Sequence, residues 1–282
     1  MSPQIDPISF SAYLLDLCVA NKTSPGDLLK LSNATGFIYK KANRMYLVTN
    51  LHVVSGVNVV TGKILDPMAN IPEFVKTVSS VYDDKTGQIR KGVSITISLY
   101  DNTMLPLWLI HPKYKRNVDI AVIPINFNEP INLFAITDVE SIETNISVAD
   151  DVFVVGYPLA LGTNETQDLP IWKRASIASE PDVNYFTDGR KAFIVDGTTR
   201  AGMSGAPVFF YNNFSQTNLQ DGGFCFNMSP KRSFCFLGIY SGRLRGNSSP
   251  EDGIDRESFL GLVWKKELID EIIDGGFRDE AY

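Results

Sequence analysis

The feature that most constrains the fold is a repeated alternation between short apolar runs and turn residues. From residue 34 onward, runs rich in Val, Ile, Phe and Tyr are separated by Gly, Asn, Asp and Pro, which is typical of antiparallel sheets. We expect strands within residues 34–40, 44–50, 93–100, 104–110, 119–125, 151–157, 173–179, 191–196, 206–211, 233–240 and 259–265. This pattern predicts an all-β fold, and that many strands suits two small barrels or sandwiches better than one.

The two barrels are expected to span residues 34–135 and 136–265, because the polar stretch 126–150 is suited to carry the crossing between them. Within the first barrel, residues 61–92 are polar and are predicted to be a long insertion, with a helical turn near residues 72–78.

A short helix is predicted in an N-terminal extension, residues 1–33. Its apolar residues Phe10, Tyr13, Leu14 and Leu17 have the spacing of one face of an amphipathic helix. The segment has no basic leader and its apolar residues are interrupted, so it is not expected to be a secretory signal.

A second helix is predicted in residues 266–282. Ile269, Ile272 and Ile273 would share one face, and a glycine pair would end the helix. We expect this helix to pack on the second barrel.

Charge and composition exclude several classes of function. The 282 residues carry 26 basic and 32 acidic side chains, a net charge of -6, which offers no electrostatic surface for nucleic acid. No apolar stretch is long enough to span a bilayer, so no membrane association is expected. Nothing in the sequence identifies a regulatory partner.

The three cysteines form no regular framework of disulfides, which favours a reducing compartment, and we expect a cytoplasmic protein. Cys225 and Cys235 would face each other across a hairpin, and we expect thiols rather than a bridge. A metal site is not predicted, since the only histidines are His52 and His111. His111 precedes Pro112 and is expected to be an ordinary surface residue.

The segment TRAGMSGAPVFF sets Ser204 between Gly202 and Gly205, just before an apolar strand. Such a turn exposes a hydroxyl and aims backbone N–H groups at one point. The N–H groups of Gly202 and Ser204 would then stabilise the negative charge that develops on a carbonyl oxygen during acyl transfer. On its own, the same segment is also consistent with a simple hairpin turn.

Two further segments supply the groups that a serine nucleophile needs. His52 follows an apolar strand, and neutral imidazole is the side chain best suited to accept the serine proton. Asp119 begins another apolar strand, where a carboxylate is costly unless it is hydrogen-bonded. An aspartate in that setting is suited to be the hydrogen-bond partner of the histidine.

Together the three segments resemble the chymotrypsin-fold, or trypsin-like, serine peptidases, especially their disulfide-poor bacterial members. The order His52, Asp119, Ser204 matches, as do the DIAV run that begins at Asp119 and the G-x-S-G-x-P pattern around Ser204. Further likenesses are VVGYPLALG from residue 154 and GIYSG from residue 238.

The resemblance implies an all-β fold of two packed antiparallel β-barrels. In such a fold, His52 and Asp119 from the first barrel would meet Ser204 from the second in a cleft. Asp119 would hold the His52 tautomer, and His52 would take the Ser204 proton as an acyl-enzyme forms. No metal or cofactor is needed for this chemistry. Met203 stands where digestive members of the family have an aspartate that pairs with a new N-terminus, so activation by cleavage is not expected.

The resemblance also implies substrate-binding residues. Thr198 would lie at the base of the first specificity pocket, and Tyr240, Ser241 and Gly242 would belong to the strand that pairs with substrate. A threonine offers no charge to a buried cation, so small or medium apolar residues are expected before the scissile bond.

The sequence therefore predicts a serine endopeptidase with a protein or peptide substrate. Two alternatives remain open. One is a peptide-binding or scaffold protein that keeps the fold with little turnover, and the other applies the same chemistry to esters or to self-cleavage only.

Overall fold

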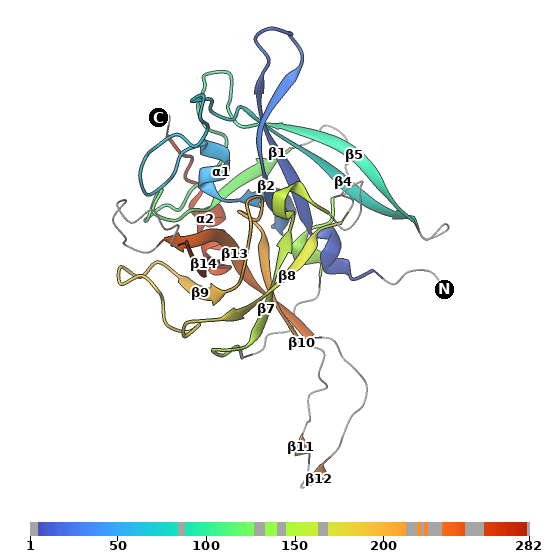
Figure 1. Cartoon of the computed structure of the whole chain (residues 1–282), viewed down its shortest axis with the longest axis vertical. Helices are drawn as coiled ribbons and strands as arrows, with labels where there is room; N and C mark the ends of the chain where they lie inside the picture. Colours follow the sequence, from blue (N-terminus) through green and yellow to red (C-terminus); the bar gives the residue numbers. More distant parts are fainter. Residues whose placement is uncertain are drawn as a thin grey trace.

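The structure is a computed structural model, and it describes residues 5–83, 88–126, 133–139, 145–162, 169–212, 219–220, 223–224, 233–245 and 257–280. Two six-stranded sheets pack against each other, and their neighbouring strands are antiparallel (Figure 1). The first sheet is open and curled, whereas the second closes into a barrel. This arrangement confirms the predicted all-β class.

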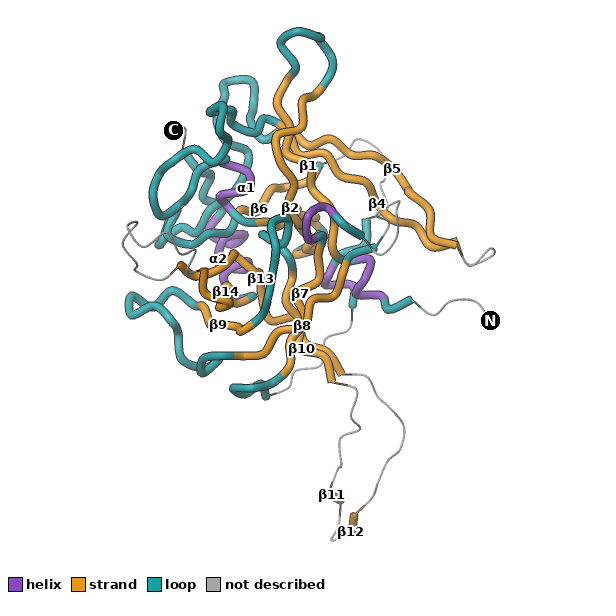
Figure 2. Tube along the Cα trace, viewed as in Figure 1, coloured by secondary structure: helices purple, strands orange, loops and turns teal. Residues whose placement is uncertain are grey.

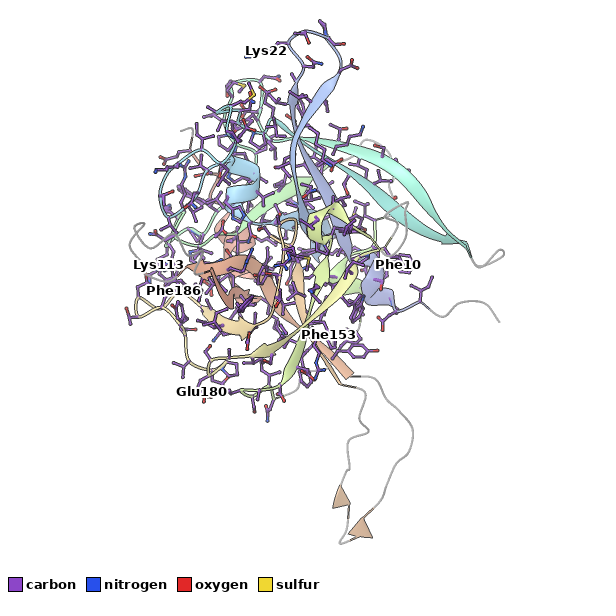
Figure 3. All side chains as sticks on the ribbon, viewed as in Figure 1. Phe10, Lys22, Lys113, Phe153, Glu180 and Phe186 are labelled. Carbon is purple, nitrogen blue, oxygen red and sulfur yellow. The ribbon has the colours of Figure 1, made fainter. Side chains whose placement is uncertain are left out.

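The first sheet has the strand order β5-β4-β1-β2-β3-β6. Its strands, in chain order, are β1 (Ala12–Ala20), β2 (Leu28–Lys41), β3 (Arg44–Thr49), β4 (Phe74–Asp83), β5 (Gln88–Ser98) and β6 (Ala121–Ile125). The β1–β2 hairpin projects from the body of the molecule with Lys22 near its tip (Figure 3). The β4–β5 hairpin forms a second projecting arm (Figure 2).

The second sheet closes in the order β10-β13-β14-β9-β8-β7. Its strands are β7 (Asp151–Gly156), β8 (Ile171–Ile177), β9 (Ala192–Asp196), β10 (Pro207–Asn212), β13 (Ser233–Arg245) and β14 (Glu257–Lys265). A separate two-stranded ladder joins β11 (Leu219–Gln220) to β12 (Gly223–Phe224).

Helices are few and short in the described part of the chain. They are α1 (Leu51–Ser55), α2 (Glu267–Gly275) and three 3-10 turns, Pro7–Phe10, Ile136–Asp138 and Pro158–Ala160. No helix in the described ranges is long and apolar enough to cross a membrane.

Alternate residues of the same strand fill different cores. Phe37 of β2 and its partner Val48 of β3 lie in a core shared by both sheets, whereas the next pair, Ile38 and Leu47, lies inside the first sheet. Phe209 of β10 joins the shared core from the second barrel. Since successive strand residues face opposite sides, such strands need apolar residues on both faces, which explains their unbroken apolar runs.

The predicted N-terminal helix is wrong. Residues 12–20 form β1, which lies between β2 and β4 in the first sheet. Tyr13, Leu15 and Leu17 are buried, while Leu14 between them is only half-buried. The segment therefore follows the two-residue period of a strand, which the helical spacing of the same apolar residues concealed.

The predicted insertion at residues 61–92 is also largely corrected. Residues 61–73 form a loop, whereas residues 74–83 form β4 and residues 88–92 belong to β5. The expected helical turn is instead the start of β4. Val75, Thr77 and Ser79 are buried in alternation, and polar residues at two of these positions weakened the strand pattern. Residues 104–110 form isolated bridges rather than the expected strand.

The C-terminal helix is confirmed as α2, which ends at Gly276 in the left-handed conformation. It packs on β14 of the second barrel, as expected, and also on β6 of the first sheet. Beyond it, the Asp279 carboxylate accepts hydrogen bonds from Trp108 Nε1 (3.0 Å) and Arg116 Nε (2.9 Å). The chain end thereby joins the two halves.

Cys18 and Cys235 are free and buried. Cys225 lies outside the described residues, so its expected state as a thiol stays a prediction.

The position of β1 within the first sheet is testable with two leucines on paired strands. Leu15→Ala should lower the free energy of unfolding by about 2–5 kcal/mol, because Leu15 is fully buried. Leu29→Ala on β2 should change it by less than about 0.5 kcal/mol, since Leu29 is half exposed. Urea denaturation measures both, and equal effects would mean that β1 is not integral to the sheet.

Candidate active site

Asp119 lies just before β6 and holds His52 through two atoms. Its Oδ1 accepts the backbone N–H of His52 (2.9 Å), an orphan donor in the first turn of α1, and its Oδ2 lies 2.7 Å from His52 Nδ1. A carboxylate accepts only, so Nδ1 carries the proton and Nε2 is left as the basic nitrogen. Both position and tautomer of the imidazole are thus set by one side chain.

The Asp119 carboxylate is almost fully buried, with 5% of its side chain exposed, while 21% of the His52 side chain remains exposed. A third donor, the Ser241 hydroxyl from β13 of the second barrel, lies 2.6 Å from Asp119 Oδ2. The buried charge is therefore compensated by hydrogen bonds from both halves of the molecule.

The environment changes the pKa of His52. Burial of the imidazole lowers it, but the negative charge and hydrogen bond of Asp119 outweigh burial, so the pKa of His52 lies above its ordinary value. The imidazole can accept a proton near neutral pH and retains a stabilised cationic form.

Ser204 lies in a tight turn that begins with residues 200–203. The N–H of Met203 donates to the carbonyl of Arg200 (3.2 Å), and Gly202 at the third position has φ +93°. Such a turn requires a positive φ there, which glycine adopts without strain. The half-buried Ser204 follows directly.

The peptide planes of this turn are fixed by hydrogen bonds to their carbonyls. The Ala201 carbonyl accepts the N–H of Leu159 (2.7 Å), and the Met203 carbonyl accepts the N–H of Ala206 (3.0 Å). In a trans peptide the N–H points away from its own carbonyl, so the N–H groups of Gly202 and Ser204 point to the opposite side. Neither N–H donates to any group in the described part of the chain.

The first sheet contacts the serine turn through Thr35 of β2. Its N–H donates to the Ser204 carbonyl (2.9 Å), and its hydroxyl donates to the Gly202 carbonyl (2.7 Å) and accepts the N–H of Tyr157 (3.1 Å). Thr35 is fully buried. One side chain thus connects the serine turn to the sheet that carries His52.

A cavity of about 370 Å³ brings the candidate residues together. His52, Gly202 and Ser204 all line it, whereas Asp119 lies behind His52. The three predicted catalytic positions therefore converge on one place from α1, the start of β6 and the turn before β10.

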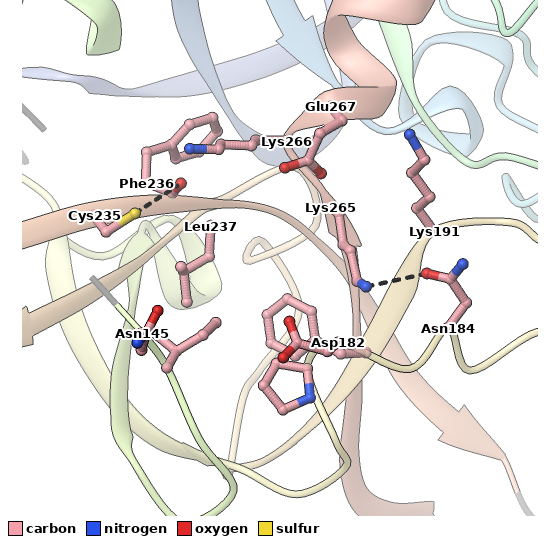
Figure 4. A pocket seen from close by; sticks show the side chains of 13 residues that line it. Asn145, Asp182, Asn184, Lys191, Cys235, Phe236, Leu237, Lys265, Lys266 and Glu267 are labelled. Atoms are coloured by element: carbon pink, nitrogen blue, oxygen red, sulfur yellow. Dashed lines mark hydrogen bonds between the residues drawn. The ribbon is translucent and has the colours of Figure 1, made fainter. Parts of the chain in front are cut away.

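A larger cavity, of about 940 Å³, lies elsewhere on the second barrel (Figure 4). It combines an apolar floor that includes Phe193 and Leu237 with charged residues such as Lys265, whose ammonium donates to Asn184 Oδ1 (3.0 Å). No predicted site residue lines it. In the described ranges, no three His, Cys, Asp or Glu side chains gather as a metal ion would need.

The predicted substrate-binding residues fall in different environments. Ser241 and Gly242 are half-buried on β13, and Thr198 is exposed. Tyr240 is buried, with its hydroxyl bonded to that of Thr199 and its ring against Gly261. The Tyr240 side chain thus packs inside the barrel behind the serine turn.

Several residues at or near the site were missed from the sequence. Thr35 begins the run TGFIY and Thr199 directly follows Thr198, but the sequence alone assigned neither of them a role. Asn50, just before α1, donates through Nδ2 to the Asp119 carbonyl (2.8 Å), and its place immediately ahead of the His52 segment was the available signal.

The surface assignment of His111 is wrong. The residue is 3% exposed, its Nε2 lies 2.8 Å from Glu271 of α2, and its Nδ1 accepts the N–H groups of Lys113 and Tyr114 (both 3.1 Å). His111 fixes a turn against α2, apart from the candidate site.

Residues 34–213 match the profile of the trypsin-like peptidase domain, which is more than half of the 282-residue chain. The chain belongs to the trypsin-like peptidase domain family. The matched part of this peptidase domain contains His52, Asp119 and Ser204, whereas β13 with Ser241 lies beyond it. No curated protein matches the chain at a significant level.

The charge of Asp119 should be visible in the titration of His52. In the wild type, the imidazole pKa should exceed about 6.5, the value of a free imidazole. Asp119→Asn removes the influences that raise it, so the pKa should fall. NMR titration of the ring signals measures both, with a His111→Gln variant to assign the two histidines, and an unchanged pKa in Asp119→Asn would contradict the pairing.

Thr35→Val tests the contact between the two halves. Valine keeps the shape but leaves the Gly202 carbonyl and the Tyr157 N–H without their buried partner, at a cost of about 1–3 kcal/mol for each group. Stability to urea should fall accordingly, while Thr198→Val at an exposed position should leave it nearly unchanged. Equal stability of the two variants would argue against the contact.

Proposed function

We propose that this chain is a serine endopeptidase in which Ser204 is the nucleophile, His52 the general base and Asp119 the residue that orients the imidazole. The Ser204 oxygen attacks the carbonyl carbon of a peptide bond as its proton passes to His52 Nε2. That proton then goes to the leaving amine as the C–N bond breaks, and water hydrolyses the resulting acyl-enzyme by the same route.

The observation that carries this proposal is the pairing of His52 with a buried carboxylate in a cavity that also holds Ser204. The 2.7 Å contact at Nδ1 leaves Nε2 as the only imidazole nitrogen able to act as a base. A serine hydroxyl needs such a base, because it is a weak nucleophile at its own pKa.

Stabilisation of the oxyanion is assigned to the N–H groups of Gly202 and Ser204. Their peptide planes are held by Leu159 and Ala206, so both donors are oriented before substrate arrives. Donors fixed in advance require no reorganisation as charge develops, and one such donor is worth roughly 2.7–4 kcal/mol in related chemistry.

We assign the binding of protein or peptide substrates to the end of β13 that follows its pairing with β10. Residues before the scissile bond would pair with the backbone at Ser241, whose hydroxyl binds Asp119, and at Gly242. Small or medium apolar residues are preferred at the position before the bond, as Thr198 supplies no charge for a Lys or Arg. The two acidic residues that follow β13 in the sequence, Glu251 and Asp252, lie outside the described residues.

A fluorophosphonate probe tests the nucleophile directly. The wild type should be labelled and Ser204→Ala should not, while Ser94→Ala, an exposed serine on β5, should label like the wild type. Labelling that persists in Ser204→Ala would refute the assignment.

Asp119→Asn should lose about four orders of magnitude in peptide turnover, because the wrong histidine tautomer is favoured.

A further inference from the structure

The cavity that holds His52 and Ser204 extends to one side of them only. Among the described residues, its remaining wall comes from β1, β2, α1 and the loop that links α1 to β4, and the second barrel contributes the serine turn alone. No residue of β13 lines it. If the peptide ahead of the scissile bond pairs with β13, as the proposed function has it, this cavity lies on the side of the leaving group.

The wall of this cavity is largely apolar. Leu17 of β1, Leu31 of β2, Val53 of α1 and Leu65 and Pro72 of the connecting loop all contribute to it. Leu65 is 50% exposed, a state that leaves apolar surface available to a ligand. A side chain that enters here would bury apolar area on several sides at once.

The loop that carries Leu65 is held in place by its own hydrogen bonds. The N–H of Leu65 donates to the Gly56 carbonyl at the end of α1 (2.8 Å). Asp66 Oδ1 accepts from the N–H of Met68 (2.9 Å) and from the N–H and Nδ2 of Asn70 (both 3.0 Å). The carboxylate at the rim is thus engaged in the loop, and the cavity is formed before any ligand binds.

Behind the serine turn, the described part of the second barrel is filled by its own side chains. The Tyr240 ring is 2% exposed, its hydroxyl is bonded to Thr199, and it packs so closely on Gly261 that a Cβ there would lie 2.4 Å from the ring. A large side chain ahead of the scissile bond therefore has little room inside the barrel. Substrates are therefore better distinguished by the side chain that enters the open cavity on the leaving-group side.

We propose that this cavity is a specificity subsite that takes a branched or aromatic apolar side chain from the residue immediately after the scissile bond. Acidic residues are rejected there, because Asp66 stands at the rim with a like charge. This inference rests on the proposed function, which decides that the cavity faces the leaving group. The cavity itself also predicts that peptides bind to it even when no hydrolysis follows.

The kinetic test uses a pair of peptides that differ only in the residue after the cleaved bond. A leucine there should give a kcat/KM at least about tenfold above that of glycine, as expected for burying most of a leucine side chain. Leu65→Asp should reduce this ratio to near one. Ile64→Asp, the neighbouring exposed residue that does not line the cavity, should preserve the ratio. A ratio near one in the wild type, or one that survives Leu65→Asp, would overturn the subsite.

A binding test separates failure of the subsite from failure of the proposed function. The Ser204→Ala variant is titrated with product peptides whose free N-terminal residue is leucine, glycine or aspartate. Binding in the order leucine, glycine, aspartate, lost in a Leu65→Asp and Ser204→Ala double variant, supports the subsite even if the wild type hydrolyses nothing. Hydrolysis by the wild type without any such order would leave the peptidase standing and the subsite refuted.

Discussion

Everything at the candidate site depends on the fully buried contact between Thr35 and the serine turn. The imidazole belongs to one sheet and the hydroxyl to the other, so their separation is only as fixed as the interface between them. Thr35 uses all its polar groups there, because its carbonyl also accepts the Thr49 hydroxyl (2.8 Å) while its N–H and hydroxyl hold the turn. Gly205 must be a glycine, since a Cβ there would lie 2.1 Å from the Thr35 carbonyl oxygen.

A second constraint acts on the donors that would face an oxyanion. Leu159 has φ +54° and the next residue, Ala160, has φ +58°, conformations that cost a non-glycine residue roughly 1–2 kcal/mol each. In this conformation the Leu159 N–H donates to the Ala201 carbonyl, and that hydrogen bond orients the Gly202 N–H. Strained backbone of this kind persists where the surrounding structure fixes it, and here it serves the geometry of the turn. Met203, the apolar residue between Gly202 and Ser204, is buried in the core of the second barrel.

The sequence was most informative where chemistry needs a particular residue at a particular place. The segments of His52, Asp119 and Ser204 were readable because each combines a reactive side chain with an adjoining apolar strand. By contrast, the segment around Leu15 carries apolar residues at both helical and strand spacings, and only its pairing with β2 and β4 decides between them. His111 was misjudged for the same reason, since its burial depends on Glu271, 160 positions further along the chain.

The cavity beside His52 and Ser204 escaped sequence reasoning, whereas Ser241 and Gly242 of β13 were named as substrate-binding residues. A catalytic constellation is defined by local motifs, whereas a subsite is a shape formed by side chains from distant segments, and ordinary leucines carry no positional signal. Leu17 lies on a strand before residue 34 and Ser241 on one after residue 213, so the matched region contains the candidate nucleophile, base and acid but only part of their surroundings. In the proposed function, the choice of substrate rests on β1, β13 and the loop before β4, which lie largely outside the motifs around His52, Asp119 and Ser204.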